Sequence, residues 1–108
     1  MRFESSIKRL QIRGYKDDED DPPRLYFDVE LEGDMGLISS LNGSDFYKNI
    51  DAIWELLSLE YGVTQLYGTV LLSHATAIKR LLRSRYSVKF IRKVKLAGRS
   101  MILVRVMK

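Results

Sequence analysis

The 108-residue sequence predicts an α+β domain with a mixed, mostly antiparallel sheet and two helices, in the order βββ-α-β-α-ββ. Three observations support this prediction. Apolar and polar residues alternate with period two toward both ends of the chain, which is typical of strands. Two amphipathic stretches with helical spacing lie between them. Turn-forming residues separate the elements, and at this length one core suffices, so we expect a single domain over residues 1–108.

The first part of the chain predicts a three-stranded meander. Within 7–15, apolar residues alternate with basic and polar ones. The segment 16–23, KDDEDDPP, is too acidic and proline-rich to be buried and indicates a solvated loop. Strand 24–32 follows, and a tight turn at 33–34 returns the chain into a strand over 35–41. The expected core face of the second strand is formed by Leu25, Phe27, Val29 and Leu31.

The segment 44–61 predicts the first helix. Ser44 is its expected N-cap and Gly62 its expected C-terminal stop. One broad apolar stripe should pack against the sheet and place Trp54 in the core. The stripe consists of Phe46, Ile50, Ile53, Trp54, Leu57 and Tyr61.

The apolar segment 63–72 lies between two helices, so we expect a central strand parallel to a neighbour. Ser73 is the expected cap of the second helix. The apolar stripe of that helix is read as Ala77, Ile78, Leu81 and Leu82. Two strands over 87–95 and 101–107, joined by a turn at 97–99, complete the chain. The first of them is expected to show Val88, Phe90 and Val94 on one face and Lys89, Ile91, Lys93 and Lys95 on the other.

Charge is distributed unevenly along the chain. Residues 73–108 hold eleven basic residues and no acidic one, and the preceding residues hold seven basic and fourteen acidic ones, so charges of +11 and −7 give the net +4. This asymmetry indicates a polyanion partner, two halves that attract each other, or a solvated surface. The expected contacts to a polyanion or nucleic acid are Arg83, Arg85, Lys89, Arg92, Lys93, Lys95 and Arg99.

Composition excludes several kinds of site. The chain has no cysteine and one histidine, so it cannot form a disulfide, a thiolate metal site or a multi-histidine metal site. No apolar run is long enough for a transmembrane helix, and the N-terminus lacks the apolar segment of a signal peptide. The basic helix has too few bulky apolar residues to insert into a membrane surface. We therefore expect a cytoplasmic protein that binds no metal and no membrane.

The predicted order of elements resembles the GNAT acetyltransferases without their initial strand and two helices. The stretch VTQLYGTVLLSHATAIKRLLRSRY, 63–86, is similar to the fifth strand and fourth helix of that family. Ala77 and Ile78 match the Ala-apolar pair of its Asn-x-x-Ala pattern, and Tyr86 stands at the place of its final Phe. The stretch also resembles the short acetyltransferase-like internal virion proteins of podophages, which implies a location in the host cell or the virion.

The resemblance implies a site for acetyl-coenzyme A between the strand ending at Leu41 and the strand ending at Leu72. The family holds the pyrophosphate with a Gln/Arg-x-x-Gly-x-Gly/Ala motif, but 39–44 here reads SSLNGS, with one glycine and no arginine. The candidate cofactor-binding residues are Asn42, Gly43, Ser44, Lys79 and Arg80. His74 stands at the family's Asn and is the candidate general base, because only its side chain titrates near neutral pH; the alternative is a polar surface residue.

Three functions are therefore compatible with the sequence. The interpretation we favour is a degenerate GNAT-like domain that serves as a binding or structural module, with a protein partner and no cofactor. The second is an active acetyl-coenzyme A-dependent N-acyltransferase. The third is a sequence-tolerant nucleic-acid-binding protein that uses its basic C-terminal half. The oligomeric state is left open by all three.

Overall fold

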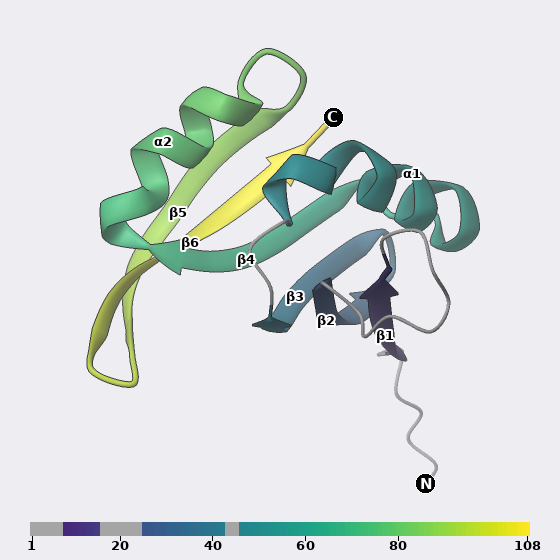
Figure 1. Ribbon diagram of the computed structural model, residues 1–108, viewed down its shortest axis with the longest axis horizontal. Helices are drawn as coiled ribbons and strands as arrows, with labels where there is room; N and C mark the ends of the chain where they lie inside the picture. Colours follow the sequence, from purple (N-terminus) through teal and green to yellow (C-terminus); the bar gives the residue numbers. More distant parts are fainter. Residues whose placement is uncertain (1–7, 16–24, 43–45) are drawn as a thin grey trace, which may run out of the picture.

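Residues 8–15, 25–42 and 46–108 are described by the computed structural model (Figure 1). The elements are β1 Lys8–Gly14, β2 Leu25–Glu32, β3 Met35–Asn42, the 3-10 turn η1 Tyr47–Asn49, α1 Ile50–Tyr61, β4 Gln65–Leu71, α2 Leu72–Leu82, β5 Ser87–Leu96 and β6 Arg99–Met107. The α+β class and the predicted order of strands and helices are confirmed. The acidic segment 16–23 lies outside the described residues.

The strands form one mixed sheet in the order β1-β2-β3-β4-β6-β5. Among the described strands, β3 and β4 are the one parallel pair, which confirms the predicted central strand. Their pairing covers three residues of each strand, from Met35 opposite Gln65 to Leu37 opposite Tyr67. Beyond these pairs, β3 continues beside β2 and β4 continues beside β6. The two parallel strands therefore diverge toward their C-terminal ends, and we call the space between them the splay.

Both helices pack on one face of the sheet, which we call the helical face (Figure 1). The strand residues in the core are Leu25, Phe27, Val29, Leu31, Leu66, Val70, Val88, Ile102 and Val104. They alternate along each strand with residues that point to the opposite, open face. All four residues of the predicted apolar face of β2 are in this core, so that prediction is confirmed.

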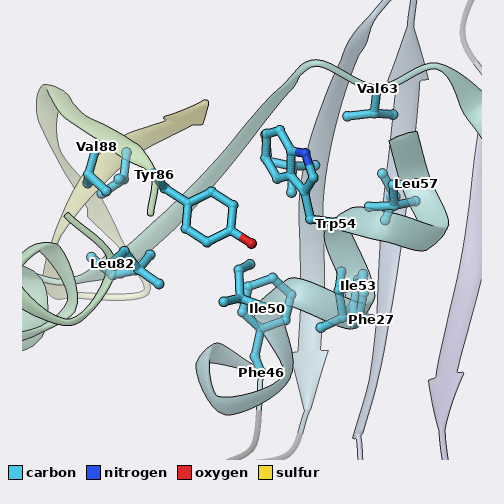
Figure 2. Packing of buried hydrophobic residues seen from close by; sticks show 14 of the residues in the cluster. Phe27, Phe46, Ile50, Ile53, Trp54, Leu57, Val63, Leu82, Tyr86 and Val88 are labelled. Atoms are coloured by element: carbon cyan, nitrogen blue, oxygen red, sulfur yellow. The ribbon is translucent and has the colours of Figure 1, made fainter. Parts of the chain in front are cut away.

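Five of the six residues of the predicted apolar stripe are buried, and Tyr61 at the end of α1 is partly buried. Figure 2 shows Trp54 and Leu57 among the core side chains, and the Phe27 and Phe46 rings meet edge to face with centroids 5.2 Å apart. Gly62 ends the helix in the left-handed region, with φ of 67°, as predicted. The predicted start is wrong: α1 begins at Ile50, after the 3-10 turn, and Ser44 lies outside the described residues.

Two predictions for α2 are wrong. The helix begins at Leu72, so Ser73 lies inside its first turn and cannot be the N-cap. The buried residues are Ala75 and Leu82, and Ile78 is partly buried between them; Ala77 and Leu81 of the predicted stripe are exposed. Spacings of three and four residues place 75, 78 and 82 on one side of a helix. Ala75 is on the buried side of the helix, but its small side chain contributes little to a hydrophobic pattern, whereas the larger Leu81 contributes strongly and is exposed.

A β-bulge in β5 changes which side chains share a face. Phe90 pairs with Val104 but Arg92 pairs with Leu103, so one extra residue lies between them. Residues directly opposite each other in an antiparallel pair lie on the same face. Val94, opposite Met101, is therefore on the open face, and the prediction that it joins Val88 and Phe90 is wrong. By the same register, Lys93 and Lys95 turn to the helical face, opposite Ile102 and Ser100.

Candidate functional site

The splay is filled by aromatic and aliphatic side chains. Phe46, Tyr47 and Ile50 enter it from η1 and the start of α1, and Ile78 enters from α2. The remaining cavity has a volume of about 30 Å³. This is room for one or two water molecules, whereas small-molecule sites hold roughly 300–1,000 Å³. Burial in this apolar region raises the pKa of the Tyr47 hydroxyl to about 12.

Of the candidate cofactor-binding residues, the structure describes the side chains of Lys79 and Arg80, and neither points into the splay. Asn42 ends β3, and Gly43 and Ser44 lie outside the described residues. Lys79 turns toward β5, where its Nζ lies 4.9 Å from the centroid of the Phe90 ring. Arg80 is exposed and follows Ala75 by five residues, which places it about 140° around the helix from the buried side. The described residues of the splay therefore do not fit coenzyme A, because they supply apolar bulk and no cationic side chain.

His74 is exposed in the first turn of α2. Helical spacing places it on the same side of α2 as Ile78, at the rim of the splay. A general base needs a partner that orients its ring. Within the described ranges, no side chain or backbone group bonds to this imidazole. His74 therefore lies near the candidate site, and the described residues supply no partner that would orient its ring for general-base catalysis.

The seven predicted polyanion contacts are all exposed, but they do not form one flat surface. Arg83 follows α2, and Arg85 is paired with Asp51 of α1. The others follow the strand β5 and its turn: Lys89 and Arg92 on the open face, Lys93 and Lys95 on the helical face, and Arg99 at the start of β6. β5 is an edge strand, and lysines on an edge also hinder pairing with another chain.

Sequence reasoning missed a polar contact between α1 and the segment after α2. The Tyr86 hydroxyl and the Arg85 guanidinium both donate to the carboxylate of Asp51. Burial raises the pKa of the Tyr86 hydroxyl, against a smaller opposing effect of Arg85. No pattern in the sequence signals this contact, because its partners are 34 and 35 residues apart.

Two hollows lie outside the splay. One of about 490 Å³ is bounded by α1 and the ends of β1 and β2, with Arg13, Tyr15 and Asn49 among its lining residues. The other, of about 270 Å³, is on the open face beside Leu37 and Tyr67. Neither was anticipated, since both depend on how distant elements pack. Within the described residues, each helix is too short or too polar to span a bilayer.

No protein-family model matches the chain, and no curated protein matches it significantly. Its fold is similar to that of several solved structures. One, from Agrobacterium tumefaciens and assigned as an acetyltransferase, has a TM-score of 0.62 at 15% identity, over 97% of this chain and 78% of that chain. A chimera of the spermidine N-acetyltransferase SpeG of Vibrio cholerae and hSSAT has a TM-score of 0.61 at 8% identity, over 94% and 68%.

A point mutant of the same Vibrio cholerae enzyme has a TM-score of 0.58 at 8% identity, over 94% of this chain and 66% of that chain, just under two-thirds of its length. At such identities the likeness shows the fold alone. The order of elements along the chain and the splay agree with the arrangement that the sequence resemblance implied. The chain therefore has the GNAT-like fold of these acetyltransferases.

Proposed function

We propose that this GNAT-like domain is a binding or structural module that transfers no acyl group and uses no cofactor. The observation that supports the proposal is the filled splay, where a cavity of about 30 Å³ remains between the parallel strands. A cofactor that entered there would have to displace side chains of the core. Phe46 and Ile50 are 5% and 2% exposed.

The cost of such a displacement can be estimated. An aromatic side chain buries about 150–250 Å² and each Å² of exposed apolar surface costs about 25 cal/mol, so moving Phe46 alone would cost roughly 4–6 kcal/mol. That is about half the free energy of unfolding of a typical small domain. The filled splay is thus part of what stabilises the fold.

A protein partner follows from the charge distribution. Exposed cations along β5 and at the end of α2 would steer an acidic partner toward this side of the molecule. The proposal includes the finer expectations from the sequence: a phage-encoded chain like the podophage internal virion proteins, located in the host cytoplasm or the virion. These expectations rest on the sequence resemblance alone.

Titration of acetyl-coenzyme A by calorimetry tests the proposal. We expect no heat of binding at 100 μM ligand and no shift in melting temperature. A ligand at 100 times its Kd would stabilise the fold by about 2.7 kcal/mol, which a melting curve detects readily. A low-micromolar Kd would overturn the proposal and favour the acyltransferase. In that case His74→Ala should lower turnover by about 10²–10⁴ if His74 is the general base.

Binding of nucleic acid through β5 is the second candidate. It is favoured by the exposed cations on both faces of this strand and by the absence of acidic residues in 73–108. Such binding would contact phosphates without reading sequence, with a slope of log affinity against log salt of about −0.9 per neutralised phosphate.

Charge reversal distinguishes this candidate. Replacing Arg83, Lys89 and Lys93 by Glu should flatten the salt dependence measured by fluorescence anisotropy. Arg13→Glu is the matched control, because β1 is the opposite edge of the sheet. If neither duplex nor single-stranded DNA binds at low salt, the candidate is rejected.

A further inference from the structure

The outer edge of β5 is free along its whole length. β5 is the last strand of the sheet, and none of the described strands pairs with its outer side. In the part of the hairpin formed by 91–100 no residue is buried, and this part projects from the core (Figure 1). A strand at the edge of a sheet presents main-chain N–H and C=O groups to which a further strand can bind. The question is which kind of strand fits this edge.

Cations line this edge on both faces of the sheet. Lys93 and Lys95 lie on the helical face and Arg92 on the open face, and all three are exposed. Among the described residues no carboxylate forms an ion pair with any of them, and 73–108 contains no acidic residue. Opposite charges on directly opposed residues of neighbouring strands attract, and like charges repel. The edge therefore disfavours a basic strand and favours one that supplies carboxylates.

An apolar row reaches the same edge on the open face. Leu71 of β4 is opposite Met101 of β6, and Met101 is opposite Val94 of β5. Leu96, the next open-face residue of β5, is 48% exposed. An apolar side chain opposite Val94 on an added strand would continue this row. Beyond the bulge, β5 thus alternates between lysines on the helical face and apolar residues on the open face.

We propose that β5 binds an extended segment of another protein, in which acidic and apolar residues alternate, as a further strand of the sheet. The acidic residues of this segment lie opposite Lys93 and Lys95, and its apolar residues lie opposite Val94 and Leu96. Alternate residues of any strand are about 6.8 Å apart, so every second residue of the segment meets one of the two lysines. The inference rests on the proposed function, because it names the chemistry of the protein partner of the binding module.

Two other occupants fit this edge less well. A second copy of β5 brings no carboxylate, so its side chains could not neutralise the lysines. A nucleic acid supplies negative charge, but its phosphates accept hydrogen bonds and cannot donate to the C=O groups of the edge. The phosphate backbone also has no apolar groups to place opposite Val94 and Leu96. An acidic strand alone satisfies the charges, the apolar row and the main-chain groups together.

Fluorescence anisotropy of labelled peptides titrated with the full chain tests the proposal. The probe is a capped heptapeptide of alternating valine and glutamate, and its control has the same residues as one valine block and one glutamate block. We expect the alternating peptide to bind at least tenfold more tightly. Equal binding of the two peptides would overturn the proposal, and so would the absence of binding.

A charge exchange tests the register. The double variant Lys93→Glu with Lys95→Glu should weaken binding of the alternating peptide about tenfold and should bind a peptide of alternating valine and lysine instead. Arg80→Glu with Arg83→Glu is the matched control, because it changes the charge equally at exposed positions on and just after α2. Circular dichroism checks folding, and Lys93→Gln with Lys95→Gln replaces a misfolded variant. Equal weakening by the two double variants would show a general charge effect and overturn the proposal.

Methylation of the peptide nitrogens tests the main-chain contact. The N–H groups of alternate residues in a strand point to the same edge, so methylating all valine nitrogens blocks one edge of the peptide and methylating all glutamate nitrogens blocks the other. One of the two methylated peptides should lose binding at least tenfold while the other keeps it. Equal effects would overturn the proposal, because an added strand uses one edge.

Two further measurements separate this inference from the other functions. Single-stranded DNA that binds more tightly than the alternating peptide, and is lost in the Lys93 and Lys95 variant, would assign the edge to nucleic acid and overturn the proposal. The titration of acetyl-coenzyme A decides the proposed function separately, since β6 lies between β5 and the strands of the splay. Binding of the cofactor would overturn the proposed function and leave the peptide results to decide the partner.

Discussion

The hydroxyl of Tyr86 donates a hydrogen bond to the carboxylate of Asp51 and thereby joins the end of the α2 segment to α1. Figure 2 shows the Tyr86 ring between Leu82 and Val88 on one side and Trp54 on the other. The Trp54 and Tyr86 rings have centroids 5.5 Å apart. The contact between α1 and the segment after α2 therefore has an aromatic part and a polar part.

Tyr86→Phe should lower the free energy of unfolding by about 1 kcal/mol, because it removes the hydroxyl and keeps the ring. Urea denaturation measures this change. A double-mutant cycle with Asp51→Ala should give a coupling of at least about 0.5 kcal/mol. Glu55→Ala, an exposed carboxylate on the same helix, is the control and should not couple. Additive effects of Tyr86→Phe and Asp51→Ala would show that the bond does not contribute to stability.

Trp54→Ala should cost on the order of 3–5 kcal/mol, because Trp54 is 4% exposed and its removal leaves a cavity beside the Tyr86 ring. Thermal or urea denaturation gives the value. Leu59→Ala on the exposed side of α1 should change stability by less than about 0.5 kcal/mol. A Trp54 variant that unfolds like the parent would contradict the observed orientation of α1.

Two glycines in neighbouring strands should respond oppositely to alanine. A Cβ at Gly36 would lie 3.0 Å from Leu66 Cδ2 and 3.1 Å from Val29 Cγ1, so Gly36→Ala should cost about 1–3 kcal/mol by overpacking. At Gly68 the nearest atom is Ile38 Cβ, at 3.8 Å. Gly68→Ala should therefore be neutral or stabilise by about 0.4–1 kcal/mol. Equal effects in urea denaturation would argue against the close packing at Gly36.

The buried hydroxyl of Tyr47 should make stability fall at alkaline pH. Its pKa is raised from 10 to about 12 in the folded chain. Between these values the unfolded chain ionises while the folded chain stays neutral, so the unfolding free energy decreases as pH rises, by on the order of 2 kcal/mol. Tyr47→Phe should lose this part of the dependence. Identical pH profiles of the two proteins between pH 9 and 12 would contradict the burial of this hydroxyl.

The turn between β5 and β6 is suited to stabilisation. Ala97 and Gly98 have φ of 51° and 76°, as in a type I′ turn, which favours Asn-Gly. Ala97→Asn should therefore raise the free energy of unfolding by about 0.5–1 kcal/mol, because Asn tolerates the left-handed region better than Ala. Ala77 is an exposed residue in the middle of α2, and Ala77→Asn should instead lower the free energy of unfolding, because Asn has a lower helix propensity than Ala. A loss of stability at position 97 would exclude this turn geometry.

Local patterns were sufficient to predict most of the fold. Alternation along β2 and the stripe of α1 predicted the two largest parts of the core, and the apolar segment before α2 predicted the parallel strand. The bulge in β5 could not be predicted from the alternation of apolar residues. Val88 and Phe90 precede the extra residue and share a face as expected, and only the residues that follow the bulge change face. The rotation of α2 depended on Ala75, a residue too small to stand out in a hydrophobic pattern.

The candidate site was less predictable than the fold. The place of the splay followed from the resemblance, but its filling by Tyr47 depends on a 3-10 turn that replaces the first turn of the predicted helix. Lys79 and Arg80 are adjacent in sequence, yet a helix separates adjacent residues by about 100°, so their side chains point in different directions. Local sequence patterns could not predict the pairing of Arg85 with Asp51 either, because the two residues lie far apart in the sequence.

The short parallel pairing of β3 with β4 also has a consequence for the folding pathway. Each half of the sheet is antiparallel, and β5 with β6 forms a hairpin that can close within microseconds. The halves of the sheet join through three residue pairs and through bonds from the Thr64 and Gln65 N–H groups to the Asp34 carbonyl, 2.8 and 3.3 Å long. The Thr64 hydroxyl also donates to the Asp34 carboxylate. The segment that links β3 to β4 must be ordered before this junction can form. The junction should therefore be the last part of the sheet to assemble and the first to exchange its amide protons with solvent.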